Sequence, residues 1–418
     1  MPAWQSLYYE QPLELVAGQG CYVVDAAGTR YLDFFGGILT TMIGHAIPEV
    51  VDAIRAQAGR LAHASTLYLA EPLVALAERI ATLSNIPDAR VFFTTSGTEA
   101  NDAALLMATS YRRSNQVLAL RNSYHGRSFS TMAITGNRSW SASSLSGLSV
   151  SFVHGGYRLR SPFRELGDDA YTAACVQDLH DVIDMTTSGD VACMIAEPIQ
   201  GVGGFATPPD GFFGAMRKVL DEHDILFIAD EVQTGWGRTG DHFWGYEAHG
   251  MVPDVLTFAK GVANGLPLGG VVARADIMNA VGANSISTFG GNPVAVAAAN
   301  ANLDYLLAHD LQGNARRVGA RMRARLEATV ARHPWIAEVR GRGLMIAIET
   351  VRPGGIEPDA PAATAVLEAA RRHGVLIGKG GLYGNVLRIA PPLSITEVEA
   401  DHGIDAIDAA IAEVAAMG

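Results

Sequence analysis

Residues 225–231 are ILFIADE, a continuous apolar run that ends in two carboxylates. Runs of the same kind recur along the chain: VFFTT (91–95), VLAL (117–120), VACMIAE (191–197) and VLTFAK (255–260). They do not alternate between apolar and polar residues, and stretches with helical spacing lie between them. Continuous apolar strands separated by helices are typical of a mainly parallel sheet that helices cover on both faces. The sequence therefore predicts an α/β fold, in which ligands bind at the carboxyl ends of the strands.

The N-terminal segment has a different pattern. Residues 1–50 are expected to form an arm with short strands, because CYVVDAAGTRYLDFF (21–35) alternates and turns at Ala27–Gly28 as a hairpin does. Helical spacing runs from Pro48 to about Leu83. We expect three parts: an N-terminal arm over 1–50 that joins the small domain, a large domain over 51–294, and a smaller α+β C-terminal domain over 295–418.

The C-terminal domain is expected to begin with an Ala-rich helix after Asn292–Pro293, followed by a strand over 339–350, a helix over 361–374 and a last strand over 385–392. Residues 137–170 are rich in Ser, Gly and Arg and are predicted as a long loop or insertion. Loops of that length usually carry a function, often as lids.

The composition excludes several classes of function. Of 418 residues, 43 are Asp or Glu and 31 are Lys or Arg, and this net charge of −12 without a basic stripe argues against nucleic acid as a partner. The first residues have neither a basic nor an apolar signal region and no apolar run of about 18 residues occurs, so we expect neither a secretory signal nor a membrane-spanning helix. Cys21, Cys175 and Cys193 form no CxxC pair, so neither a disulfide framework nor a thiolate metal site is predicted. We expect a soluble cytoplasmic enzyme without a metal.

The chain contains three lysines, and one of them has an unusual setting. Lys218 lies on a polar helix face, where a solvated charge is expected. Lys379 lies in GVLIGKGG, which lacks the Ser or Thr that follows the lysine of a phosphate loop. Lys260 ends an apolar strand and precedes GVANGLPLGG. A desolvated lysine there would hold the neutral amine that forms a Schiff base, although a buried salt bridge explains the position equally well.

Pyridoxal phosphate (PLP), a cofactor held by such a lysine, also needs an anion site, a carboxylate and a flat or apolar support. The turn Ser96-Gly97-Thr98 lies between a strand and a helix, whose free N–H groups form an anion site. The two hydroxyls of this turn add donors. Ser or Thr followed by Glu is also an ordinary capping box, so this motif alone is weak.

The other two requirements have candidates at strand ends. Asp230 can pair with a protonated pyridine nitrogen, and Gln233 can reach the phenolic oxygen, although an Asp here is also a plausible helix N-cap. Tyr124 or His125 offers a ring to stack on the cofactor, although isolated aromatic residues are more often part of a core. The interpretation gains weight because the four signals occur together, each at a predicted strand end. No HExxH, GxSxG or complete phosphate loop competes, and GVGG (201–204) does not fit GxGxxG.

Several blocks resemble the class III, fold-type I aminotransferases. These are SGTEAN (96–101), SYHGRS (123–128), EPIQGVGG (197–204), IADEVQTGWGRTG (228–240), FAKGVANGLPLGG (258–270), TFGGNP (288–293) and LRIAPPL (387–393). Residues 7–38 look most like the branch that contains the class III alanine–glyoxylate aminotransferases. The resemblance implies a fold-type I PLP transferase, with a large PLP-binding domain and a smaller C-terminal domain.

The resemblance also implies roles by position. Lys260 would be the Schiff-base lysine and proton shuttle, Asp230 would pair with the pyridine nitrogen, and Gln233 would bond the ring oxygen. Tyr124 would stack on the ring. Thr288 would reach the phosphate of the neighbouring subunit.

Gly97 and Thr98 would hold the phosphate within their own subunit. The role of Thr288 implies a homodimer with shared active sites, and the sequence does not separate a dimer from a tetramer.

Substrate binding is implied for two arginines. Arg388 would bind the substrate α-carboxylate in a bidentate pair. Relatives that use 2-oxoglutarate often have a Glu after EPIQG to pair with this arginine when no carboxylate is bound, and here the position is Val202. Glu197 is an unsuitable substitute, because an odd offset along a strand would direct it to the opposite face. Arg127 holds a second carboxylate in ornithine-type relatives, but the same arginine occurs in members with other substrates.

The sequence thus predicts an aminotransferase that moves an amino group from an amino acid or ω-amine to a small 2-keto acid by a ping-pong mechanism. Val202 favours pyruvate or glyoxylate. The alternatives are a decarboxylase, racemase, aminomutase or phospholyase on the same scaffold, a 2-oxoglutarate-dependent ω-aminotransferase, and a non-enzymatic homologue. The donor stays open, with Phe35–Ile38, Tyr68 and residues 137–170 as candidate linings.

Overall fold

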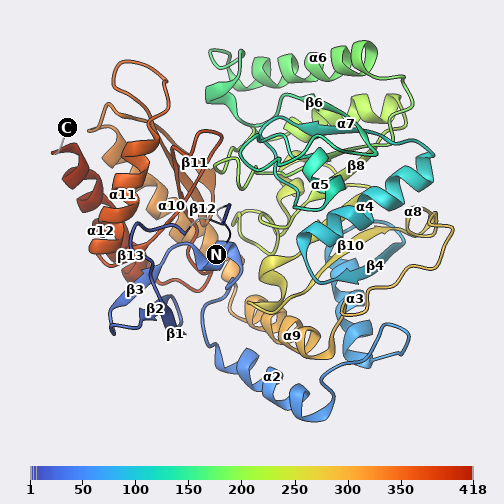
Figure 1. Ribbon diagram of the computed structural model, residues 1–418, viewed down its shortest axis with the longest axis horizontal. Coiled ribbons are helices and arrows are strands. Elements are labelled where there is room, and N and C mark those ends of the chain that lie inside the picture. The colour runs from blue at the N-terminus through green and yellow to red at the C-terminus, as the bar shows by residue number, and fades with distance from the viewer. Residues whose placement is uncertain (1, 3, 6, 417–418) are drawn as a thin grey trace.

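The computed structural model describes residues 2, 4, 5 and 7–416 and contains two adjoining bodies (Figure 1). The larger body is built on a seven-stranded sheet in the order β4-β10-β9-β8-β7-β5-β6. Its strands are β4 (Ala89–Thr94), β5 (Gln116–Leu120), β6 (Ser149–Val153), β7 (Cys193–Ala196), β8 (Leu226–Asp230), β9 (Val255–Phe258) and β10 (Gly269–Arg274). Only β10 runs antiparallel to its neighbours within this sheet, so the predicted α/β fold with a mainly parallel sheet is confirmed.

The strands fit the predicted apolar runs because β7, β8 and β9 are buried along their whole length. Since β10 is antiparallel to both β4 and β9, these two strands run in the same direction as β8, β7 and β5. With β6, which is parallel to β5, six carboxyl ends therefore meet at one edge of the sheet, and the predicted cofactor residues other than Thr288 lie at or after the ends of four of these strands, β4, β5, β8 and β9.

The prediction of one long loop over 137–170 is wrong in part. β6 lies within it and pairs with β5 as the edge strand of the sheet, and α6 begins at Asp168. The strand escapes a search for continuous apolar runs because its burial is incomplete, as expected at an edge.

Helices pack around this sheet and join it to the smaller body. The helices and helical turns of residues 36–308 are α1 (Gly36–Leu39), α2 (Pro48–Arg60), α3 (Glu71–Leu83), α4 (Gly97–Arg112), α5 (Phe129–Ala133), η1 (Arg158–Arg160), α6 (Asp168–Thr186), α7 (Phe212–Glu222), η2 (Gly245–His249), η3 (Lys260–Ala263), α8 (Ala275–Met278) and α9 (Pro293–Ala308). The Asn292 side chain caps α9, in line with the expected start. α9 packs on α2 and α3, and the division of the chain at residue 294 stays a prediction.

The smaller body contains a four-stranded antiparallel sheet of β11 (Ile336–Arg342), β12 (Met345–Thr350), β15 (Val386–Ile389) and β14 (Gly378–Gly380). The predicted strand over 339–350 is thus a hairpin. The helices of this body are α10 (Leu311–Val330), α11 (Ala360–Arg372) and α12 (Glu397–Ala415).

The N-terminal segment and the C-terminal part of the chain meet in a second small sheet. The strands β1 (Leu15–Gln19), β2 (Tyr22–Asp25) and β3 (Arg30–Asp33) form an antiparallel meander, and the predicted turn at Ala27–Gly28 joins β2 to β3. β13 (Val375–Leu376) adds to β3 in parallel, which joins the N-terminal segment to the C-terminal part (blue and red in Figure 1). Among the described residues, no helix is long and apolar enough to cross a membrane.

Candidate active site

A cavity of about 300 Å³ is walled by residues that follow β4, β5, β7, β8 and β9 at their carboxyl ends. All the predicted cofactor-binding residues except Thr288 line it: Ser96, Gly97, Thr98, Tyr124, His125, Asp230, Gln233 and Lys260. Residues separated by more than 150 positions therefore meet at one site, as expected from strands whose carboxyl ends share an edge.

Asp230 ends β8 and is held in one orientation. Its Oδ2 accepts a hydrogen bond from Asn101 Nδ2 at 2.8 Å and lies 2.7 Å from His125 Nδ1. Its Oδ1 accepts the Val232 N–H at 3.2 Å. The side chain is 4% exposed, so this carboxylate is a fixed charge in a low-dielectric wall.

Lys260 follows β9 and begins η3 with a φ of +46°, a left-handed conformation that is uncommon for a residue with a Cβ. Strain of this kind gathers at functional sites. Loss of hydration lowers the pKa of the Lys260 amine, although the carboxylates of Asp230 and Glu197 raise it. Lys218 is exposed on α7 and Lys379 lies in β14, so Lys260 is the lysine that faces the cavity.

A tight turn joins β4 to α4 at the cavity. Ser96 is the N-cap of α4, and its Oγ accepts the Glu99 N–H at 3.2 Å. Glu99 Oε2 accepts the N–H and the hydroxyl of Thr95, both at 2.7 Å. Ser96 therefore has the capping role that the sequence left open. The start of a 16-residue helix, with Gly97 and Thr98 in its first turn, still faces the cavity and forms an anion site.

Two buried polar atoms of cavity residues, His125 Nε2 and Gln233 Oε1, have no hydrogen-bond partner among the described residues. Such atoms are costly to bury, and a bound polar ligand would relieve that cost. The Tyr124 ring lies at the wall with Trp140 packed against it edge-on, 5.4 Å between centroids. A lysine, a helix start, a fixed carboxylate, a ring and unsatisfied polar atoms are the set that PLP requires, so these residues fit the cofactor.

Two functional candidates were missed by the sequence analysis as site residues. Glu197 is 3% exposed, and its carboxylate accepts the Tyr124 N–H at 2.9 Å and the Gly201 N–H at 2.7 Å. Burial raises the pKa of this carboxyl group. Asn101 bonds both Asp230 and the His125 carbonyl. The available signal for Asn101 was a polar residue on the buried face of α4. For Glu197, the expectation that an odd offset along a strand directs it to the opposite face did not apply, because β7 ends at Ala196.

Arg388 lies in β15, outside the cavity wall, and is 3% exposed. Its guanidinium donates to the carbonyls of Gly201 at 3.4 Å and Lys379 at 3.0 Å, and to Tyr8 Oη at 3.2 Å. It forms no ion pair with any described residue, and its Nε has no partner among them. The Phe35 ring lies 4.9 Å below it.

The structure does not bring Arg127 or Thr288 into the cavity of their own chain. Arg127 is exposed, and its guanidinium lies 5.2 Å from the centre of the Trp4 ring. Thr288 is exposed beside a separate hollow that it shares with Thr95 and Glu99 near the start of α4. Within the described residues, no cluster of His, Cys, Asp and Glu could hold a metal ion.

Nearly the whole chain matches the model of a protein family. The family model described as "Aminotransferase class-III" covers residues 7–411. The chain belongs to this family. A mitochondrial alanine–glyoxylate aminotransferase 2 homologue of Arabidopsis thaliana is 41% identical over 96% of this chain and 83% of its own. The mitochondrial alanine–glyoxylate aminotransferase 2 of Homo sapiens is 33% identical over 97% and 83%.

Solved structures agree with this assignment to the class III aminotransferases. An amine transaminase from an uncultivated Pseudomonas species, solved with PLP bound, superposes with a TM-score of 0.91 at 34% identity, covering 97% of this chain and 95% of that one. An (S)-enantioselective omega-transaminase from Thermomicrobium roseum gives 0.90 at 36% identity, covering 97% and 93%. The fold is therefore fold-type I, and this class III aminotransferase is a PLP-dependent enzyme, as the resemblance implied.

Proposed function

We propose that this aminotransferase transfers the amino group of an amino acid or ω-amine to pyruvate or glyoxylate in preference to 2-oxoglutarate. The observation that carries the proposal is Arg388, a buried arginine bonded to two carbonyls and one hydroxyl and to no carboxylate of the described chain. A buried charge without a counter-charge is costly, so a small substrate that always brings an α-carboxylate compensates it best. The similarity to alanine–glyoxylate aminotransferases supports the same choice.

Val202 is the residue beside Arg388 that supports the preference for pyruvate or glyoxylate. A donor without an α-carboxylate would leave the Arg388 charge uncompensated unless the protein offered its own carboxylate. The Val202 backbone lies next to Arg388, since both approach the same Cβ position of Gly380, and its side chain has no charge to offer. Glu197 is held by the Tyr124 and Gly201 N–H groups instead.

The cavity residues then have defined tasks. PLP, when bound, supplies the electron sink for the carbanion that forms at the substrate carbon. We assign Lys260 Nζ to the covalent link with the cofactor and to the transfer of the substrate proton. The Asp230 carboxylate keeps the pyridine nitrogen protonated, and the start of α4 binds the phosphate. Gln233 bonds the ring oxygen, and Tyr124 supports the ring.

We further propose a cytoplasmic homodimer in which Thr288 completes the phosphate site of the other subunit. Thr288 is exposed between Ile286 and Phe289, which are 54% and 62% exposed, and apolar surface of this kind favours a partner. Mixing inactive Lys260→Ala protein with an inactive Thr288 variant should restore partial activity after subunit exchange. No recovery despite proven exchange would contradict the shared site.

The acceptor proposal is tested in two steps. Donor alone should convert the bound cofactor to its amino form, which separates an aminotransferase from the other PLP reactions. The kcat/KM values for pyruvate, glyoxylate and 2-oxoglutarate are then compared with the same donor. We expect pyruvate or glyoxylate to be the better acceptor, and a tenfold preference for 2-oxoglutarate would overturn the inference from Val202.

A further inference from the structure

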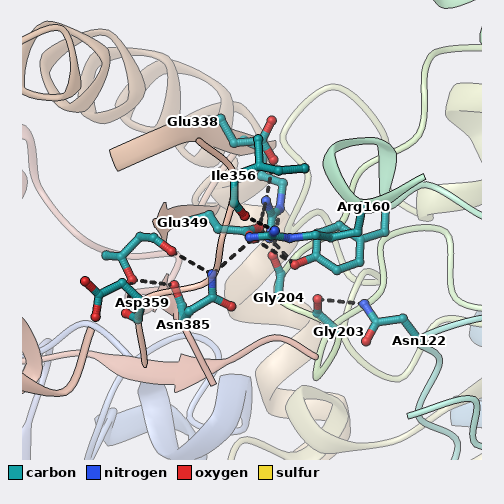
Figure 2. Close-up of polar contacts among 12 residues, drawn as sticks. Asn122, Arg160, Gly203, Gly204, Glu338, Glu349, Ile356, Asp359 and Asn385 are labelled. Atoms are coloured by element: carbon teal, nitrogen blue, oxygen red, sulfur yellow. Dashed lines mark hydrogen bonds and ion pairs between the residues drawn. The ribbon is translucent and has the colours of Figure 1, made fainter. Parts of the chain in front are cut away.

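The turn Gly201–Gly204 is held at every carbonyl. The Gly201 oxygen accepts Arg388 Nη1 at 3.4 Å, and the Val202 oxygen accepts the Gly381 N–H at 2.9 Å. Asn122 Nδ2 donates to the Gly203 oxygen, and Arg340 Nε to the Gly204 oxygen, both at 2.9 Å (Figure 2). Three of these four donors belong to the smaller body, so this turn forms hydrogen bonds between the two bodies.

The two arginines that bond this turn lie at paired positions on neighbouring strands. Arg340 on β11 and Arg388 on β15 both pair with Ala347 on the intervening strand β12. Side chains at paired positions of adjacent strands point to the same face of a sheet. The two guanidiniums therefore approach the turn from one face, Arg340 at Gly204 and Arg388 at Gly201.

Glu349 lies two residues after Ala347 on that face and has no exposed surface. Its carboxylate accepts Arg340 Nη1 at 2.6 Å and Asn385 Nδ2 at 3.1 Å from the smaller body. From the larger body, Tyr157 Oη donates to it at 3.0 Å and Arg160 Nη2 at 2.6 Å (Figure 2). One carboxylate thus joins both bodies.

The same carboxylate is connected to Arg388 along two short routes. One runs through Arg340 to Gly204 and along the turn to Gly201, which Arg388 bonds. The other runs through Asn385, which directly precedes β15. The turn 201–204 also contacts the cavity wall, because the Glu197 carboxylate accepts the Gly201 N–H. A Cβ on Gly201 would lie 2.2 Å from the Gln233 side chain, so a larger residue there would displace the end of that side chain.

We propose that Glu349 is a positioning residue for the substrate carboxylate: it fixes Arg340 and β15 so that Arg388 is held at the turn beside the cofactor cavity. This inference rests on the proposed role of Arg388. It assigns the segment 157–160, predicted as part of a lid, to the fixed contact between the two bodies.

The test uses Glu349→Gln, which keeps the shape and removes the charge that holds two arginines. Glu327→Gln, the same change in an exposed ion pair with Arg323, is the control. Pyruvate and acetaldehyde differ by the carboxylate and serve as paired acceptors. Because a displaced binding group raises KM, we expect kcat/KM for pyruvate to fall roughly 10- to 100-fold through KM, with acetaldehyde changed less than about twofold. The cofactor absorbance should be unchanged.

Tyr157→Phe is the second variant, because it removes one hydroxyl from the cluster and is expected to fold even if Glu349→Gln does not. It should raise KM for pyruvate about threefold, within the range of one lost hydrogen bond, and leave acetaldehyde unchanged. Equal losses on both acceptors, or none in either folded variant, would overturn the inference. Arg388→Gln separates the two proposals: if it leaves the preference for pyruvate intact, the role of Arg388 itself fails. If Arg388→Gln removes that preference and the Glu349 and Tyr157 variants do not, only the positioning role fails.

Discussion

Arg340 and Arg388 occupy equivalent places and differ in one respect. Both flank Ala347 on the same face of one sheet, and both bond a carbonyl of the turn 201–204. Arg340 is neutralised by Glu338 and Glu349, whereas Arg388 has no carboxylate among the described residues.

Burial lowers the pKa of Arg340, but the attraction of Glu349 and Glu338 outweighs burial and raises it above the ordinary value. A buried arginine that carboxylates neutralise has its counter-charge within the fold, whereas a buried arginine without a carboxylate can receive that counter-charge from a ligand. The partners of a buried charge, more than the charge itself, therefore distinguish a structural residue from a functional one.

The largest effect is expected in the cofactor cavity beside Arg388, at Lys260. Lys260→Ala removes the amine that carries the substrate proton, so turnover should fall by about 10²- to 10⁴-fold or more. The free energy of unfolding should not fall, because a desolvated lysine contributes little to the fold. Borohydride reduction followed by peptide mapping of the parent enzyme should place the cofactor on Lys260. Label on Lys218 or Lys379 would contradict the assignment.

Substitution of Arg340, the arginine with carboxylate partners, should lower the stability of the fold. Arg340→Met leaves Glu338 without its arginine and Glu349 with Arg160 as its remaining counter-charge, and we expect the free energy of unfolding to fall by about 1–3 kcal/mol. Arg388→Met removes a charge without a carboxylate partner and should change it by less than about 1 kcal/mol. Urea unfolding at matched protein concentration and cofactor loading measures both. Equal losses in the two variants would show that the carboxylate partners of Arg340 do not distinguish it from Arg388.

Asp230→Asn tests the fixed carboxylate of the cavity at nearly constant size. Loss of one electrostatic stabiliser should slow the chemical step by at least ~10²-fold in single-turnover experiments. Asp230 raises the pKa of Lys260, so its removal should lower that pKa further. The acid limb of the reaction between apo-protein and PLP should therefore move to lower pH. A shift to higher pH, or a near-normal single-turnover rate, would mean that another group faces the pyridine nitrogen.

Much of the cavity was accessible from the sequence because continuous apolar runs mark buried strands, and the residues after them share one edge. Lys260 and Asp230 were found in this way. The cluster around Glu349 was not, since Tyr157 and Arg160 stand in one segment and Glu349 in another, and the two segments meet only through tertiary packing. β10 and β6 were missed for simpler reasons: β10 continues directly from the glycine-rich stretch after Lys260, and β6 is a half-exposed edge strand.

The most direct test of the central claim compares acceptors in the parent enzyme and in Arg388→Gln. The ratio of kcat/KM for pyruvate to kcat/KM for acetaldehyde reports what the α-carboxylate contributes to binding. If the Arg388 guanidinium binds the α-carboxylate, the substitution should lower this ratio about 10- to 150-fold, the equivalent of a lost hydrogen bond to a charged group. An unchanged ratio in a folded, cofactor-loaded variant would show that the carboxylate binds elsewhere and would contradict the account.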